Sequence, residues 1–277
     1  MLAVVTGASA GLGEAFACRL AAAGWDLVIT ARRGSRLEAL ARTLSETRRV
    51  QVRVQVADLT VPAHRAQLES LVANRDVDLL VNNAGFAGYA PFAQVEPRIL
   101  DDLIAVHIWA TTGLTRAALP RMLRRNSGAV INIASVLAFS ASVPPTPLPF
   151  RATYAAAKAY LVAFTQALAG ELRGTGVQVE VCCPGLIDTE FPTGMERSSI
   201  RFPRMGPGEV VDAALAALSL GEVVCVPGLG DAALTDQVED SQWELFSSAV
   251  VGPLADRYRD VSGFRRPGAR VARFSTP

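Results

Sequence analysis

The sequence has few of the features that mark nucleic-acid-binding or membrane proteins. Its 27 lysines and arginines almost balance 26 acidic residues, and a net charge of +1 offers no basic face to a polyanion. No apolar run approaches the ~20 residues that a membrane helix needs. The apolar start Leu2–Val5 leads directly into a glycine loop, unlike a signal peptide. We therefore expect a soluble, cytoplasmic protein that binds neither nucleic acid nor membrane.

Cysteine is also scarce, and its placement indicates no metal site. Two of the four cysteines, Cys182 and Cys183, are adjacent, and all four stand in apolar surroundings without the spacing of metal ligands. Cysteines of this kind are typical of a reduced, buried core. The sequence therefore predicts four core cysteines and no metal ion.

Apolar residues, by contrast, are abundant, at 50% of 277 residues against only 19% charged. Short β-type runs alternate with segments of helical periodicity, which predicts a Rossmann-type doubly wound parallel sheet of about seven strands with helices on both faces. We expect a single domain over residues 1–277, with residues 228–277 as a C-terminal extension. The expected strands are 2–6, 26–30, 50–56, 77–81, 128–134, 177–183 and 223–226. The expected helices are one ending at residue 23, then 34–46, 62–74, 97–125 in two segments, 154–174 and 209–220.

A glycine-rich turn, Thr6–Gly13, lies between the first strand and the first helix. Glycines let the backbone turn tightly and approach a pyrophosphate, and the helix N-terminus adds free amides and the positive end of its dipole. A tight turn without a ligand is the alternative. The strand before the turn and the helix after it favour a nucleotide site.

The end of the second strand carries Arg32 and Arg33, about 20 residues beyond the glycine turn. An acidic residue at this position would hold the ribose 2′-hydroxyl of NAD, whereas arginine accommodates the 2′-phosphate of NADP. The two arginines therefore favour NADP(H), with NAD(H) or dual use left open.

A tyrosine and a lysine, Tyr154 and Lys158, stand one helical turn apart in an alanine-lined segment. A free tyrosine titrates near ~10 and is a poor proton donor at neutral pH. An ammonium about 4 Å away would favour the phenolate by about 4 kcal/mol at an effective dielectric of about 20. This pair therefore predicts a tyrosine whose pKa is lowered towards neutrality for acid–base catalysis, although the spacing also occurs by chance.

Together these motifs resemble the short-chain dehydrogenases/reductases. The matching stretches, spread over roughly residues 2 to 226, are TGASAGLG at Thr6–Gly13, NNAG at Asn82–Gly85, Ser135 at a strand end, YAAAK at Tyr154–Lys158 and PG at Pro184–Gly185. Five motifs in the order of that family make the resemblance specific.

The resemblance implies a catalytic trio. Tyr154 would exchange a proton with the substrate oxygen, Lys158 would lower the pKa of Tyr154 and hold the nicotinamide ribose, and Ser135 would bind the substrate carbonyl or alkoxide. A strand-end cap is the alternative for Ser135. The resemblance also implies a cofactor site, in which Asp58 receives the adenine amino group. Its expected residues are Gly7, Ser9, Ala10, Gly11, Leu12, Gly13, Arg32, Arg33, Asp58, Leu59, Asn82, Asn83, Ala84, Gly85, Tyr154, Lys158, Pro184, Gly185, Ile187 and Thr189.

Two features depart from the family pattern. His107 stands where a helical asparagine usually helps to connect the lysine to solvent, and a histidine with a pKa near ~6.5 would offer a proton relay. The loop between Ser135 and Tyr154 is proline-rich and longer than usual. We expect residues 136–151 and 186–208 to form substrate-side loops, with Phe139 and Phe150 among an apolar lining.

The resulting functional prediction is an NADP(H)-dependent oxidoreductase that interconverts a ketone or aldehyde and its alcohol. The expected partner is a small hydrophobic carbonyl or alcohol substrate, and the resemblance implies a homodimer or homotetramer. Two alternatives remain open from the residues: a non-catalytic nucleotide-sensing regulator, and an isomerase or dehydratase of the same fold.

Overall fold

The fold is centred on seven parallel strands that form one open sheet. The computed structural model describes residues 1–145, 148–191, 202–250, 252–255 and 258–259. The strands are β1 (Leu2–Thr6), β2 (Asp26–Ala31), β3 (Val52–Val56), β4 (Leu79–Asn82), β5 (Gly128–Ile133), β6 (Val177–Cys182) and β7 (Val224–Cys225). Their order across the sheet is β3-β2-β1-β4-β5-β6-β7, and each neighbouring pair is parallel. The predicted Rossmann-type sheet is confirmed.

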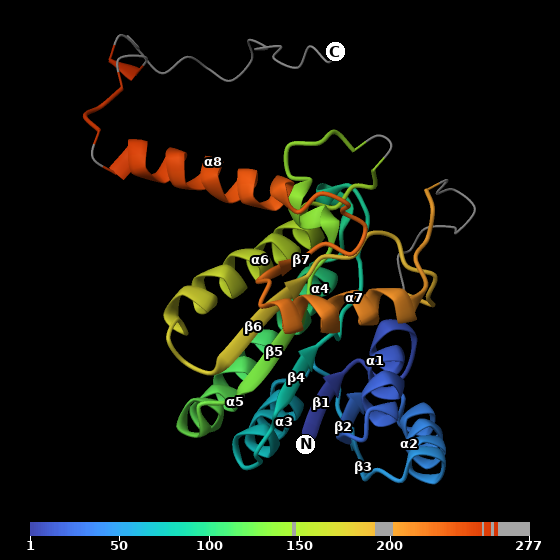
Figure 1. Cartoon of the computed structure of the whole chain (residues 1–277). Helices are drawn as coiled ribbons and strands as arrows, with labels where there is room; N and C mark the ends of the chain where they lie inside the picture. The colour runs from blue at the N-terminus through green and yellow to red at the C-terminus, as the bar shows by residue number, and fades with distance from the viewer. Residues whose placement is uncertain (146–147, 192–201, 251, 256–257, 260–277) are drawn as a thin grey trace. The chain divides into compact units, whose positions relative to one another are not determined.

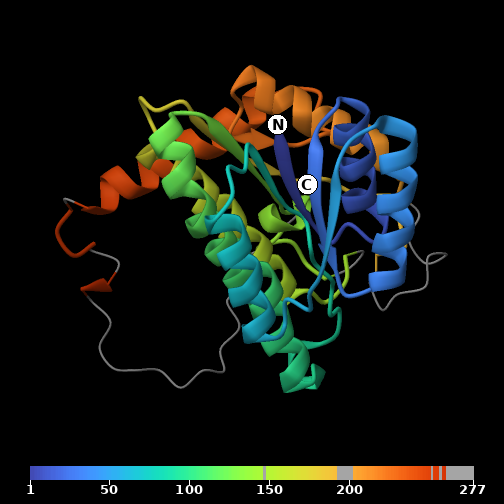
Figure 2. The ribbon, with the colours of Figure 1, turned by 90° about the horizontal axis from the view of Figure 1, so that it is seen from below.

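Helices cover both faces of the sheet (Figures 1 and 2). One face carries α1 (Gly11–Ala22), α2 (Gly34–Arg48) and α7 (Pro207–Leu220), and the other carries α3 (Pro62–Ala73), α5 (Thr111–Arg125) and α6 (Ala152–Glu171). A further helix, α4 (Pro97–Ile104), leads into α5. This arrangement follows from parallel strands, whose connections must cross the sheet and therefore bury both of its faces.

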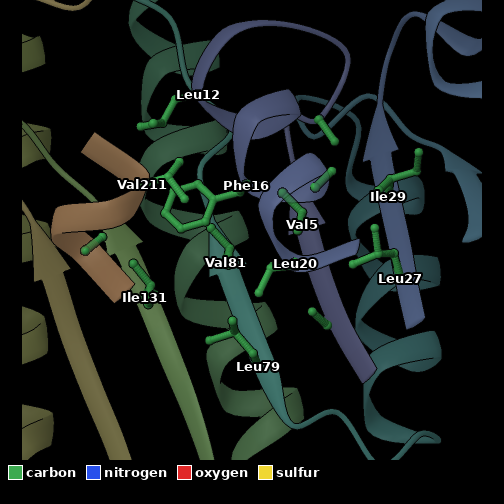
Figure 3. Packing of buried hydrophobic residues seen from close by; sticks show 14 of the residues in the cluster. Val5, Leu12, Phe16, Leu20, Leu27, Ile29, Leu79, Val81, Ile131 and Val211 are labelled. Carbon is green, nitrogen blue, oxygen red and sulfur yellow. The ribbon is translucent and has the colours of Figure 1, made fainter. Parts of the chain in front are cut away.

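Alternation along the strands assigns side chains to two separate cores. In β1, Val5 packs with the α1–α2–α7 core, whereas Val4 packs with the α3–α5–α6 core. Figure 3 shows Phe16 of α1 among Val5, Val81 and Val211, where it is fully buried. Full burial of such a side chain stabilises the fold by about 1.5–3 kcal/mol, so the two cores hold the strand ends in place.

Several boundaries differ from the sequence-based expectation, and three of them have a structural reason or consequence. β4 begins at Leu79 instead of Val77, and the carboxylate of Asp78, just before the strand, accepts a hydrogen bond of 2.8 Å from the Leu2 backbone N–H. α7 begins two residues early because Pro207 suits the first helical turn and the Glu209 carboxylate accepts from the Gly206 N–H at 2.7 Å. β7 is only two residues long, so it is a short edge strand.

The predicted two-segment helix over residues 97–125 is continuous, with a π-helical turn over Ala105–Ala110 between α4 and α5. A π turn is rare and often marks a functional site, because the extra residue redirects side chains. His107 lies within this turn and is 1% exposed.

A buried polar chain crosses the middle of the sheet. The Asn82 amide donates to the side chains of Asn132 and Thr115, and the Asn132 amide donates to Thr165 Oγ1 at 2.9 Å. These bonds connect β4, β5, α5 and α6. Because buried amides need partners, this chain fixes how the two central strands sit beneath the helices.

Contacts within the chain divide it into two compact units, Met1–Leu229 and Gly230–Pro277. The second contains α8 (Ala233–Val250), whose residues Trp243, Phe246 and Val250 are exposed. Parts of the predicted loops and extension, residues 146–147, 192–201, 251, 256–257 and 260–277, lie outside the described residues. None of the helices in the described ranges is both long and apolar enough to cross a bilayer.

The prediction of four core cysteines is wrong for one of them. Cys182, Cys183 and Cys225 are buried, whereas Cys18 is exposed. Cys18 lies on the outer side of α1, between the buried Ala17 and the exposed Arg19, because the helical period turns it away from the sheet. All four thiols are free.

Candidate active site

The three predicted catalytic residues meet where β5 ends and α6 begins. Ser135 stands two residues after the end of β5, and Tyr154 and Lys158 share one face of α6. All three are buried, with exposed fractions of 8%, 6% and 3%. A hydroxyl, a phenol and an amine so poorly hydrated need polar partners, and their contacts determine what they can do.

Lys158 is held by the sheet. Its Nζ donates a 2.7 Å hydrogen bond to the carbonyl of Ile133, the last residue of β5. The same nitrogen lies 5.6 Å from the centre of the Tyr154 ring. Burial lowers the pKa of Lys158 to about 7, so its charge changes near neutral pH.

Tyr154 does not have the lowered pKa that its spacing from Lys158 predicted. Burial raises its pKa above the ordinary value of 10.0, the neighbouring Tyr89 raises it further, and a hydrogen bond with the Ser135 side chain opposes the rise. The prediction is wrong for this arrangement because desolvation of the phenol is the largest effect on its pKa, and Lys158 Nζ donates its hydrogen bond to the Ile133 carbonyl. At neutral pH Tyr154 is therefore a protonated phenol.

Ser135 takes part in two interactions at once. Its Oγ accepts a 3.2 Å hydrogen bond from the Leu137 N–H and so caps a short 3₁₀ turn, Val136–Phe139. Its side chain also hydrogen-bonds Tyr154. The cap proposed as an alternative role is thus present, and it orients the hydroxyl towards the phenol.

His107 faces Tyr154 edge-on, with ring centres 5.7 Å apart. Its Nε2 lies 2.9 Å from the Phe86 carbonyl oxygen and 3.3 Å from the Phe86 backbone nitrogen, while the buried Nδ1 has no hydrogen-bond partner among the described residues. Burial, and then the charge of Lys158, lower the pKa of His107 to about 3. A relay that depends on a pKa near ~6.5 is therefore not available here, and the imidazole is neutral.

The position of the His107 imidazole also explains why residue 85 is a glycine. A Cβ at Gly85 would lie 2.5 Å from Cε1 of His107, closer than any real contact. Gly85 is the last residue of the NNAG motif, so the turn after β4 and the π turn fit together only without a side chain at this position.

Aromatic side chains surround the phenol. Tyr89 lies edge-on at 5.4 Å and Phe191 at 6.4 Å from the Tyr154 ring. The two residues predicted for the apolar lining, Phe139 and Phe150, are 44% and 52% exposed. Sequence reasoning missed Tyr89 and Phe191, and their only signal was a position in the segments that follow β4 and β6.

Arg151 anchors the proline-rich loop and was also missed. It is 8% exposed, and its guanidinium donates to Ser140 Oγ at 2.7 Å and to the carbonyls of Ser140, Val143 and Pro149 at 2.7, 2.9 and 3.0 Å. One side chain thus satisfies backbone groups that the prolines leave without partners. Because Arg151 stands one turn before Tyr154, it ties this loop to the catalytic helix.

The glycine turn has the shape of a phosphate cradle. Gly7 and Gly11 have φ angles of +69° and +60°, and a Cβ at Gly13 would lie 2.5 Å from the Gly7 carbonyl oxygen. The Asn83 amide braces the turn by donating to the Thr6 carbonyl at 2.8 Å. No side chain caps the N-terminus of α1, so no capping group competes with a ligand for the first backbone N–H groups of this helix. These features fit a pyrophosphate group.

Arg32 and Arg33, the residues predicted to bind a 2′-phosphate, are exposed, and Arg33 also contacts other side chains. Arg33 Nε donates to Ser9 Oγ at 3.1 Å, and Arg33 and Arg36 lie 3.5 and 2.7 Å from the Glu190 carboxylate. Arg32 is exposed as well. Glu190, which sequence reasoning missed, therefore connects the segment after β6 to the arginines after β2.

The remaining predicted cofactor residues lie at or follow the carboxyl ends of β1, β3, β4 and β6. Asp58 accepts from the Thr60 N–H and Oγ1; burial raises its pKa, but these bonds and Arg32 more than offset that effect and lower it. Asn82 turns its amide into the sheet, as described above. The others, placed at the same edge, are Ala10, Leu12, Leu59, Ala84, Pro184, Gly185, Ile187 and Thr189, with Thr189 3.1 Å from the Cβ position of Gly11.

Known proteins share this architecture. A profile of the family described as short chain dehydrogenase matches residues 1–198. A protein named as an oxidoreductase, from Staphylococcus saprophyticus, is 32% identical over 222 residues, 78% of this chain and 90% of that protein. A short-chain dehydrogenase from Sphingobium yanoikuyae in complex with NADPH has a TM-score of 0.87 and 34% identity, covering 93% of this chain and 99% of its own. The bulky-bulky ketone specific alcohol dehydrogenase from Comamonas testosteroni has a TM-score of 0.84 and 29% identity, covering 93% and 98%.

The lowered pKa of Lys158 predicts a pH dependence of stability. Between about 7 and the ordinary value of 10.5 the unfolded chain binds more protons than the folded chain, so the contribution of Lys158 to the free energy of unfolding rises with pH. It is least favourable below pH 7. Relative to Lys158→Met, the wild type should therefore gain stability from pH 7 to pH 9 in urea denaturation. A constant difference between the two proteins would contradict this assignment.

The Arg151 anchor predicts a local effect on the proline-rich loop. Arg151→Gln loses most of four hydrogen bonds, so we expect the free energy of unfolding to fall by about 2–3 kcal/mol and hydrogen exchange to increase over residues 137–145. Arg173→Gln, at an exposed arginine, is the control and should change stability by less than about 0.5 kcal/mol. Unchanged exchange in the loop would show that Arg151 does not hold it.

Proposed function

The chain belongs to the short-chain dehydrogenase family, and on that premise we propose that it is an NADP(H)-dependent oxidoreductase that interconverts a ketone or aldehyde and its alcohol. Membership follows from the family profile over residues 1–198 and from relatives named as oxidoreductases. The observation that carries the proposal is the buried group of Ser135, Tyr154 and Lys158 at the sheet edge that also holds the glycine cradle.

The protonation states at the site suit reduction. When bound, the reduced nicotinamide supplies the hydride that attacks the carbonyl carbon. Tyr154, protonated at neutral pH, donates its proton to the carbonyl oxygen, and Ser135 positions that oxygen by a hydrogen bond. The phenolate left behind is stabilised by the ammonium of Lys158, 5.6 Å from the ring centre. Lys158 is therefore needed once charge has formed on the phenol, rather than before.

The preference for NADP(H) is supported by Arg32 and Arg33 at the end of β2 and by the NADPH complex of the Sphingobium yanoikuyae relative. Two exposed guanidinium groups at this position provide charge-assisted hydrogen bonds for a 2′-phosphate. Glu190 pairs with Arg33 at 3.5 Å and with the neighbouring Arg36 at 2.7 Å, so a 2′-phosphate bound by Arg33 would compete with the Glu190 carboxylate. NAD(H) lacks this phosphate, so it would not replace the Glu190 carboxylate as a partner of the arginine.

The aromatic side chains around Tyr154 support a hydrophobic substrate. Tyr89 and Phe191 flank the phenol, and Phe139 and Phe150 remain exposed in the loop that Arg151 anchors. Such a lining favours a hydrophobic carbonyl compound. The relative from Comamonas testosteroni, described as specific for bulky-bulky ketones, makes ketones with two large substituents the first to test.

A homodimer or homotetramer formed through the long helices remains part of the proposal. Exposed apolar side chains on the α4–α5 helix support it: Trp109 is 61% exposed, Leu123 42% and Ile104 37%. Large apolar groups of this kind are stabilised when a second copy covers them.

Removal of the phenol tests the proposed activity. Tyr154→Phe should lower kcat for NADPH-dependent ketone reduction at least about 100-fold, followed at the nicotinamide absorbance, while NADPH binding measured by fluorescence stays within a few-fold. Tyr160→Phe is the control on the same helix, because its hydroxyl bonds Thr112 at 2.8 Å. If the folded wild type binds NADPH but turns over none of a broad panel of ketones and alcohols, the chain is a nucleotide-sensing regulator instead.

Cofactor preference is tested by two substitutions with opposite expected effects. Arg33→Ala should raise Kd for NADPH about 10- to 100-fold and leave NADH nearly unchanged. Glu190→Gln should lower Kd for NADPH, because it removes the competing carboxylate. Arg48→Ala, at the far end of α2, serves as control. A wild-type preference for NADH would overturn the assignment.

A further inference from the structure

A glutamate without partners lies in the interior, away from the catalytic residues. Glu180 in β6 is fully buried, and neither of its carboxylate oxygens has a hydrogen-bond partner among the described residues. A buried polar group without a partner costs free energy, and a buried carboxylate costs most of all. The reaction proposed above makes no use of Glu180.

Two thiols accompany this carboxylate. Cys182 stands two residues after Glu180 in β6 and so points to the same face of the sheet, where it joins the core beneath α7. Cys225 of β7 pairs with Cys182 in the parallel register. The Sγ atoms of both cysteines and a carboxylate oxygen of Glu180 all lie within 4.8 Å of one another, and all three residues are buried.

We propose that Glu180, Cys182 and Cys225 supply three ligands of a zinc site, whose fourth tetrahedral position is left to a water molecule. Two thiolates and a carboxylate are a donor set that zinc accepts, with Zn–S near 2.3 Å and Zn–O near 2.0–2.2 Å. Tetrahedral bonds of these lengths separate two sulfur ligands by about 3.8 Å. The side chains would therefore need to approach by at most about 1 Å, which rotation of the thiols and the carboxylate provides.

Zinc binding requires the ligands to release protons. On binding, each thiol releases its proton to solvent, and Glu180 releases one as well if it is protonated beforehand. Three anionic ligands around Zn²⁺ leave a net charge of −1, the same as in a site of three cysteines and one histidine. Cysteine and carboxylate oxidation states do not change.

A metal ion at this site would stabilise the edge of the sheet. β7 is held to β6 by a register of only two residue pairs, Val181 with Val224 and Cys182 with Cys225. An ion bound by both Cys182 and Cys225 would clamp this short strand to its neighbour. The catalytic Lys158 lies on the opposite side, because α6 packs with the core that contains Cys183 rather than Cys182.

Cobalt(II) and zinc(II) titrations of the full, reduced chain test the site. We expect one Co²⁺ per chain with a thiolate-to-cobalt charge-transfer band in the near ultraviolet, displacement by Zn²⁺, and a zinc-dependent rise in melting temperature. Cys182→Ser, Cys225→Ser and Glu180→Gln should lose or weaken the band and the rise. Cys183→Ser, a buried cysteine on the other face, and Cys18→Ser, an exposed one, are matched controls that should keep both.

Two results would overturn the proposal. The first is a folded, reduced wild type that binds neither ion through thiolate; Glu180 would then be a neutral acid, its pKa raised to about 9 by burial. The second is binding that survives both Cys182→Ser and Cys225→Ser. If those variants do not fold, protection of Cys182 and Cys225 from alkylation by zinc in the wild type, mapped by mass spectrometry, decides the question.

Discussion

The hydrogen bond from Lys158 to the carbonyl of Ile133 is the contact on which the active site depends. It ties the catalytic helix α6 to the last residue of β5 and so sets the distance from the phenol of Tyr154 to the hydroxyl of Ser135. The sheet supplies this carbonyl at a fixed position, because β5 is paired on both sides by β4 and β6. A flexible amine thereby becomes a rigid part of the scaffold, which is how catalytic groups gain pre-organisation.

Most of the architecture could be predicted from the sequence because it depends on local signals. The alternation of β-type runs with helical periodicity located all seven strands, and the glycine turn, Ser135 and the Tyr154–Lys158 pair stand in short motifs at strand or helix ends. The π turn at His107 could not be predicted, since the imidazole in it packs against Gly85 and Phe86, which are about 20 residues away in the sequence. Glu190 was missed because its partners Arg33 and Arg36 are more than 150 residues away in the sequence, and Arg151 was missed because no local pattern reveals how the proline-rich loop folds around its guanidinium.

The electrostatic predictions failed for a related reason. The spacing of Tyr154 and Lys158 suggested a lowered pKa for Tyr154, and the ordinary pKa of histidine suggested that His107 would titrate near neutrality. For both residues, however, burial has the largest effect on the pKa, because it destabilises the charged form. The same effect brings the pKa of Lys158 to about 7. The pocket therefore disfavours ions generally, and charge is stable there only beside an opposite charge. Desolvation depends on the complete fold, and a spacing of four residues carries no information about it.

The contact between Gly85 and His107 links two motifs that are distant in the sequence. His107 fills the space that a Cβ at position 85 would occupy, so neither position can change freely on its own. A smaller residue at position 107 would leave room for a Cβ at position 85. Substitutions at the two sites should consequently be non-additive, and a chain that acquires His107 by evolution or by design must already possess the glycine that receives it.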